Sequence, residues 1–277
     1  MSGEQIPLTE GQIPEARIRR RRLFRLIWVV PVIALAVAAW LVCRFDPRYG
    51  PFDVFARWSW PRWGDQLRLL QIGLPIGFNF LVDVTSFTFM ALFIARLGTA
   101  SSGGHQIAGN LASLIYMMPL AMASATGVLT GQAIGAGDPR RARLTGIIGI
   151  GSGLVCACVV GLLVWLGRDV IAGLYTRDDE VRTIAATLLA YVAGYHLFDA
   201  VSAIAVSALR GYKKTVVPML CNIVALWGLG LGGGYALALG PSLHMGAAGF
   251  WIGATAGVLT GSILIVVYFL RVSRVAR

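Results

Sequence analysis

The stretch YVAGYHLFDAVSAIAVSALRGYKK, residues 191–214, places a carboxylate, Asp199, inside a run that is otherwise apolar enough to cross a membrane. An acidic residue at the centre of a spanning helix costs about 2.5–3.5 kcal/mol on insertion scales, so it normally faces a cavity or a partner. On a helix, Tyr195 lies four residues before Asp199 and Ser202 three residues after it, so the three side chains share one face. That face can offer oxygen ligands to a small cation.

The composition of the whole chain is typical of a polytopic membrane protein. Its 277 residues are 57% hydrophobic and 13% charged, with a mean hydropathy of +0.72, far from the averages of soluble domains. The net charge of +11 comes from short basic clusters between apolar runs, a pattern of cytoplasmic loops rather than of a nucleic-acid-binding surface. The four cysteines lie in or at the ends of apolar runs, and they predict neither a metal site nor a disulfide framework.

The first part of the sequence predicts a tail, a membrane anchor and a linker. Residues 1–22 are polar and end in the run RIRRRR, so we expect a disordered tail. Residues 23–43 are apolar and long enough to span a bilayer as an uncleaved helix, with a cleaved signal peptide as the alternative. Residues 44–66 are rich in aromatic residues, arginine and proline, and we expect them to form an interfacial linker.

Six further apolar runs predict an all-α bundle of membrane-spanning helices. They lie at about residues 67–97, 104–134, 142–166, 182–209, 216–239 and 247–270. In the last run, Gly249, Gly253, Gly257 and Gly261 follow one another at four-residue spacing. We call these four residues the glycine edge, and we expect it to let a second helix approach closely. The predicted fold is one six-helix lobe, residues 67–277, plus one extra N-terminal transmembrane helix.

Basic residues also predict the orientation of the helices in the membrane. If the C-terminus lies in the cytoplasm, fourteen arginines and lysines of the loops lie inside and four lie outside. The first span disagrees with this topology, because six arginines precede it or lie at its start and seven spans would place them outside. We therefore expect a cytoplasmic C-terminus and a junction between sequences of different origin near residues 43–44.

Two carboxylates near the middle of predicted spans are the candidate functional groups. Asp83 has Asn79 four residues before it on the same helical face, as Asp199 has Tyr195. No lysine or arginine is expected at the same depth, so a mobile cation or a proton is the expected partner, with a buried structural carboxylate as the alternative. Protons and Na⁺ would compete for these carboxylates, which is the behaviour that an ion-coupled exporter requires.

Other polar residues give weaker signals. Asn79 and Ser202 can support the carboxylates, and His196 adjoins them, although a single histidine in a helix is more often hydrogen-bonded structure than a ligand. The sequence contains no hydrolytic triad, phosphate-binding loop or metal-ligand spacing, so we expect neither an enzyme nor a cofactor. Na⁺ is a possible metal at Asp83, Asp199 and Tyr195, with H⁺ as the alternative coupling ion.

Residues 44–277 resemble the C-terminal lobe of the multidrug and toxic compound extrusion (MATE) transporters. The resemblance rests on GLPIG (73–77), VDVTSFTFMALFIARLG (82–98), HQIAGN (105–110), GQAIGAGDPRRAR (131–143) and FDAVSAIAVSALRGYKK (198–214). It implies that the cation site of that lobe falls on Asp83, Asp199 and Tyr195, with Asp83 at a position where many members have glutamate. It also implies Na⁺- or H⁺-coupled antiport of a small-molecule drug or toxic organic cation across the inner membrane.

The resemblance covers one of the two similar lobes that this family has. Residues 6–41 resemble instead the tail and anchor of the paraquat-inducible protein B family, envelope lipid-transport proteins of the MCE class. The lobe is expected to work as a homodimer or with a missing N-terminal lobe, in contact with membrane lipid and without nucleic acid. The alternative is a truncated remnant that does not transport, or a membrane scaffold or regulatory subunit.

Overall fold

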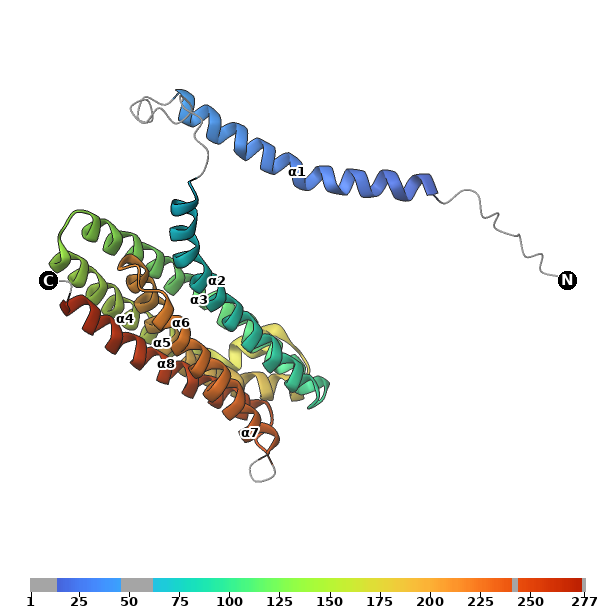
Figure 1. Ribbon diagram of the computed structural model, residues 1–277. Coiled ribbons are helices and arrows are strands. Elements are labelled where there is room, and N and C mark those ends of the chain that lie inside the picture. Colours follow the sequence, from blue (N-terminus) through green and yellow to red (C-terminus); the bar gives the residue numbers. More distant parts are fainter. Residues whose placement is uncertain (1–13, 46–61, 241–243, 276–277) are drawn as a thin grey trace. The chain divides into compact units, whose positions relative to one another are not determined.

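The computed structural model describes residues 14–45, 62–240 and 244–275, and within those ranges it contains helices and no strand. The chain divides into two compact units, Met1–Trp63 and Gly64–Arg277. The first unit contains helix α1 (Pro14–Phe45), and the second contains a bundle made of the helices that follow it (Figure 1).

The bundle is built from six helical segments, each long and apolar enough to cross a membrane. The segments are α2 (Trp63–Ala95), α3 (Thr99–Gly135), α4 (Pro139–Tyr175), α5 (Asp179–Gly211), a composite of α6 (Val216–Asn222), the π-helix η2 (Ile223–Gly232) and α7 (Gly233–Leu239), and α8 (Ala247–Val275). The expected all-α bundle of six membrane-spanning helices is therefore confirmed.

Helix α1 differs from the expected boundaries. It begins at Pro14, so the basic run that was expected to end a disordered tail at Arg22 lies within a helix. Alanine and arginine have high intrinsic helix propensities, and proline is well accepted in a first turn, which explains the earlier start. Within the part of α1 whose side chains are described, Val30–Phe45 is apolar. The linker expected at residues 44–66 lies mostly outside the described residues.

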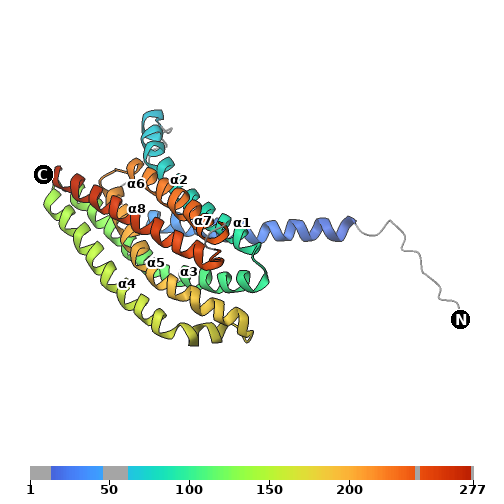
Figure 2. The ribbon, with the colours of Figure 1, turned by 90° about the horizontal axis from the view of Figure 1, so that it is seen from below.

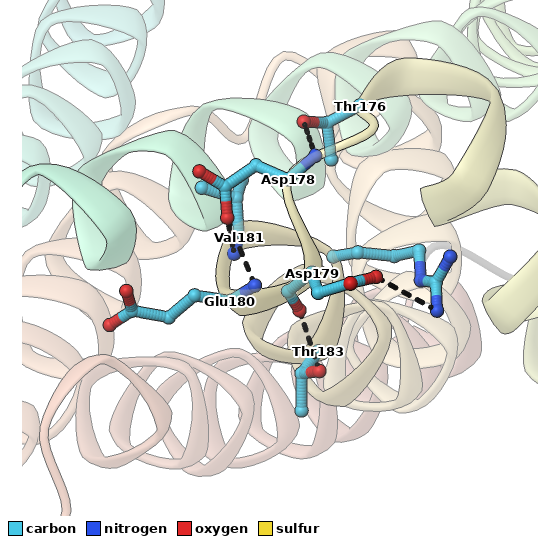
Figure 3. A network of polar contacts seen from close by, with 7 residues as sticks. Thr176, Asp178, Asp179, Glu180, Val181 and Thr183 are labelled. Atoms are coloured by element: carbon cyan, nitrogen blue, oxygen red, sulfur yellow. Dashed lines mark hydrogen bonds and ion pairs between the residues drawn. The ribbon is translucent and has the colours of Figure 1, made fainter.

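The start of α5 is fixed by a capping aspartate. The Asp178 carboxylate accepts hydrogen bonds from the backbone N–H groups of Glu180 and Val181 at 2.9 and 3.1 Å (Figure 3). The Thr176 hydroxyl accepts one from the Asp178 backbone N–H at 3.1 Å. The first N–H groups of a helix have no partner within it, so this cap stabilises the end of the helix that carries Asp199.

Helix α5 is the central helix of the bundle. It packs against α3, α4 and α8, which lie alongside it in both views (Figures 1 and 2). Its most apolar window is 61% buried inside the protein, whereas the corresponding windows of α2 and α3 are 22% buried. The polar face of α5 therefore faces protein rather than lipid.

The glycine edge of α8 makes the close approach that its spacing predicts. A Cβ atom on Gly253 would lie 2.5 Å from the Gly234 Cα atom and 2.7 Å from the Gly230 carbonyl oxygen. A Cβ atom on Gly257 would lie 3.0 Å from the Gly230 Cα atom. These distances are too short for any side chain, so α8 contacts η2 and α7 backbone to backbone. The contact fixes the position of η2 beside the cavity described next.

Candidate cation-binding cavity

A cavity of about 620 Å³ lies inside the bundle. Its walls are formed mainly by α2, α3 and α5, with Asn222 and a few residues of η2 and α8 completing them. The volume lies within the roughly 300–1,000 Å³ range of pockets that bind drug-sized molecules. Apolar and aromatic side chains form most of the wall surface, and polar side chains from several helices converge on it.

Five of the six side chains predicted from the sequence line this cavity. Asn79 and Asp83 come from α2, and Tyr195, Asp199 and Ser202 come from α5. Both carboxylates are half-buried because part of their surface faces the cavity, whereas Tyr195 is only 5% exposed. Two helices that are distant in sequence thus present one carboxylate each to a common space.

His196 does not line the cavity. Its side chain is 2% exposed and its Nε2 atom has no hydrogen-bond partner in the described part of the chain. Its position follows from helical geometry, because one residue beyond Tyr195 the side chain points about 100° away around the helix axis. His196 is therefore next to Tyr195 in the sequence but does not face the cavity.

Two asparagines connect Asp83 to the end of α6. The Asn222 side-chain amide donates to the Asn79 Oδ1 atom at 2.9 Å, and the Asn79 amide donates to the Asp83 Oδ2 atom at 3.5 Å. Both asparagines are buried. The second bond is long and therefore weak. The Asp83 carboxylate thus remains able to bind a proton or to coordinate a cation.

A cluster of aromatic rings holds Tyr195 in place. The Tyr195 ring makes edge contacts with Phe87 of α2 and Trp251 of α8, each with ring centroids 5.9 Å apart. His105 of α3 lies 5.9 Å from the Trp251 ring. Four helices therefore contribute to the cluster, and the position of the Tyr195 hydroxyl is set by packing rather than by its own rotamer preference.

The π-helix η2 is tied to α2 along one wall of the cavity. The Trp227 indole N–H donates to the Val82 carbonyl oxygen at 3.4 Å, and the Ser86 hydroxyl donates to the Leu226 carbonyl oxygen at 3.5 Å. π-Helical turns are rare and occur frequently at functional sites. Here the π-helix contacts the helix that carries Asp83.

Arg210 is the residue that sequence reasoning placed wrongly. Arg210 follows the apolar run expected at residues 182–209, where the sequence predicted a basic loop, but it lies in the last turn of α5 and lines the cavity. Its guanidinium carbon lies 5.5 Å from the centroid of the Phe80 ring. The signal that could have found it is spacing, because eleven residues make about three helical turns and place Arg210 on the face of Asp199.

Tyr116 and Asn222 also line the cavity without having been singled out from the sequence. Each lies on a different helix from the two carboxylates, and spacing along one helix does not reveal its contacts with another. Among the described residues, no group of three or more His, Cys, Asp or Glu side chains could hold a metal ion. The carboxylate, hydroxyl and amide oxygens present are instead the ligands that hard cations prefer.

Sequence comparisons find relatives that cover most of the chain. The MatE family profile matches residues 75–236. A probable multidrug resistance protein NorM of Aromatoleum aromaticum is 43% identical over 239 residues, which cover 85% of this chain and 51% of that protein. The multidrug resistance protein PmpM of Pseudomonas aeruginosa is 36% identical over 228 residues, covering 82% of this chain and 48% of that protein. The chain thus spans about half the length of the curated relatives it matches.

Solved structures share the arrangement of the helices. The crystal structure of the eukaryotic MATE transporter AtDTX14 matches with a TM-score of 0.76 at 21% identity, covering 87% of this chain and 55% of that one. A MATE crystal structure in the straight conformation matches with a TM-score of 0.78 at 17% identity, covering 88% and 54%. With the family profile and the sequence relatives, these findings establish that this multi-pass membrane protein belongs to the MatE family.

Proposed function

We propose that this lobe couples the entry of Na⁺ or H⁺ to the export of a drug or another toxic organic compound across the inner membrane. The observation that carries the proposal is that Asp83 and Asp199, from two different helices, face one cavity together with Tyr195. The relatives are named multidrug resistance proteins, which supports export of such compounds. The proposed activity is transport and involves no catalytic residue or cofactor.

The proposed coupling works by competition for the two carboxylates. A Na⁺ ion would be held by Asp83, Asp199 and the Tyr195 hydroxyl, and Asn79 and Ser202 line the same cavity and would support it. A proton would need only one carboxylate. In either case the coupling ion removes negative charge that an organic cation would otherwise neutralise, so the arrival of one favours the release of the other.

We further propose that the lobe acts with a second lobe, either another copy of the chain or a separate N-terminal lobe. Transporters of this kind move substrate by rocking two repeats against one another around a central site. The N-terminal segment, which resembles paraquat-inducible protein B at residues 6–41, would then serve as an additional membrane anchor outside the lobe.

Efflux from living cells tests the proposed function. Cells producing the full chain are expected to expel ethidium several times faster than cells with an empty vector, and collapse of the Na⁺ or proton gradient should remove the difference. The measurement is the loss of intracellular ethidium fluorescence after preloading. Efflux equal to that of the empty vector would contradict transport by this chain and favour a scaffold or a remnant.

The proposed orientation predicts where reporters fused to the chain become active. Green fluorescent protein fused after Arg277 is expected to fluoresce, and alkaline phosphatase fused there is expected to be inactive, because the C-terminus lies in the cytoplasm. Fusion after Arg177, in the turn between α4 and α5, should give the opposite pair of results. Active phosphatase at Arg277 would reverse the proposed topology.

A further inference from the structure

Three charged side chains line the cavity, and the sum of their charges is not zero. Among the described residues that line it, Asp83 and Asp199 are acidic and Arg210 is basic. The other titratable groups facing this space are His105, Tyr116 and Tyr195. The tyrosines carry no charge near neutral pH, and His105 is buried with no partner for its Nδ1 atom, so a charge on its ring would be uncompensated.

Arg210 is held where it acts on the cavity. The backbone next to it packs tightly on α3, since a Cβ atom on Gly211 would lie 2.9 Å from the Thr130 Cβ atom and 3.0 Å from the Gly131 nitrogen. The guanidinium lies over Phe80, and its buried Nε atom has no hydrogen-bond partner in the described part of the chain. The close packing fixes the backbone of α5 beside α3 at this point, and the contact with Phe80 places the guanidinium at the cavity wall.

The charge of Arg210 reaches Asp83 through space. Arg210 and Asp83 attract one another electrostatically, but in the described residues no carboxylate oxygen lies within the 4.0 Å limit of an ion pair with Arg210. The guanidinium therefore offsets one of the two negative charges without occupying the coordination positions of either carboxylate. In a medium of low dielectric constant, such an interaction is screened far less than in water.

We propose that Arg210 sets the net charge of the cavity to one negative charge, and that the cavity therefore selects singly charged organic cations over dications. The inference rests on the proposed function, since it specifies the substrate of the same site. One Na⁺, one proton or one organic monocation neutralises the cavity equally well, so the exchange is one for one. A dication would bring a second positive charge that loses its hydration without a counter-charge in the cavity, and this desolvation cost weakens its binding.

Ethidium and propidium provide a direct test, because they share a phenanthridinium ring and carry one and two positive charges. The full chain, purified into lipid nanodiscs, is titrated with each dye at pH 8 without Na⁺, and binding is followed by fluorescence. The wild type is expected to bind ethidium about tenfold more tightly than propidium. In Arg210→Met, the ratio of the two dissociation constants should shift toward propidium by at least about tenfold. Arg210→Lys keeps the positive charge and should keep the wild-type preference.

A double variant separates the effect of charge from the loss of the side chain. Asp83→Asn combined with Arg210→Met restores one net negative charge, so it should return the ratio of the dissociation constants to the wild-type value. A ratio in Arg210→Met equal to that of the wild type would overturn the inference, as would a double variant that behaves like Arg210→Met. If the wild type binds neither dye, the proposed substrate site itself is wrong, which distinguishes failure of the proposed function from failure of the charge assignment.

Discussion

Asp199→Asn is expected to abolish gradient-driven ethidium efflux, a loss of several-fold that returns the rate to that of cells with an empty vector. Asparagine keeps the size and the polarity of the side chain but replaces one acceptor oxygen with an amide donor and removes the negative charge that both the coupling ion and an organic cation require. With Arg210 present, the change leaves the cavity without a net charge. The measurement is the initial rate of ethidium loss from preloaded cells at matched protein levels.

Asp65→Asn is the matched control for this prediction. Asp65 lies exposed in the first turn of α2, outside the cavity, so the same chemical change there should leave efflux unaltered. A second readout is the midpoint of thermal unfolding, since a bound cation stabilises the folded state by mass action. Na⁺ or a lower pH should raise the midpoint of the wild type but not that of Asp199→Asn. Wild-type efflux in Asp199→Asn would remove Asp199 from the coupling mechanism.

Gly253→Val is expected to lower the thermal midpoint of the purified chain by about 10 °C or more, or to prevent its accumulation in the membrane. Overpacking a core typically costs about 1–3 kcal/mol when neighbouring side chains can shift. At Gly253 the nearest atoms are backbone atoms of Gly234 and Gly230, so relief requires the separation of two helices. The measurement is thermal unfolding in detergent, followed by loss of the monodisperse peak in size-exclusion chromatography.

Gly151→Val provides the control for the glycine edge. Gly151 is exposed on α4, and among the described residues no atom beyond its own helix lies within 4 Å of a Cβ atom placed there. The midpoint should therefore stay within a few degrees of the wild type. An unchanged midpoint in Gly253→Val would mean that α8 does not contact η2 and α7 as closely as the structure shows.

The helices could be predicted from the sequence because each membrane-spanning helix is a continuous run of apolar residues. Six apolar runs gave the six segments, but not their full lengths. The run at 142–166, for example, became α4, which extends from Pro139 to Tyr175. High hydropathy indicates only the part of a helix that lies in lipid. Polar turns, such as the one around Arg168, extend the helix although their hydropathy is low.

The residues of the candidate site could be predicted only where the spacing of polar residues within one helix indicates them. The cost of an isolated carboxylate identified Asp83 and Asp199, and four-residue spacing brought in Asn79 and Tyr195. Arg210 was missed because a basic cluster after an apolar run is typical of a loop, while its long side chain and helical position place it in the cavity. Contacts between helices, such as that of Asn222 with Asn79, depend on how the helices pack and not on spacing within either.

The rotation of α7 about its axis relative to α6 depends on the backbone conformation of η2, which lies between them. A chain that closes i→i+5 hydrogen bonds turns less per residue than an α-helix, so tightening Ile223–Gly232 into an α-helix would rotate α7 relative to α6. Asn222 precedes this segment and bonds to Asn79, whereas Gly234 follows it and packs against α8. Such a rotation cannot preserve both contacts. Conversion of η2 into an α-helix would therefore separate either Asn222 from Asn79 or Gly234 from α8.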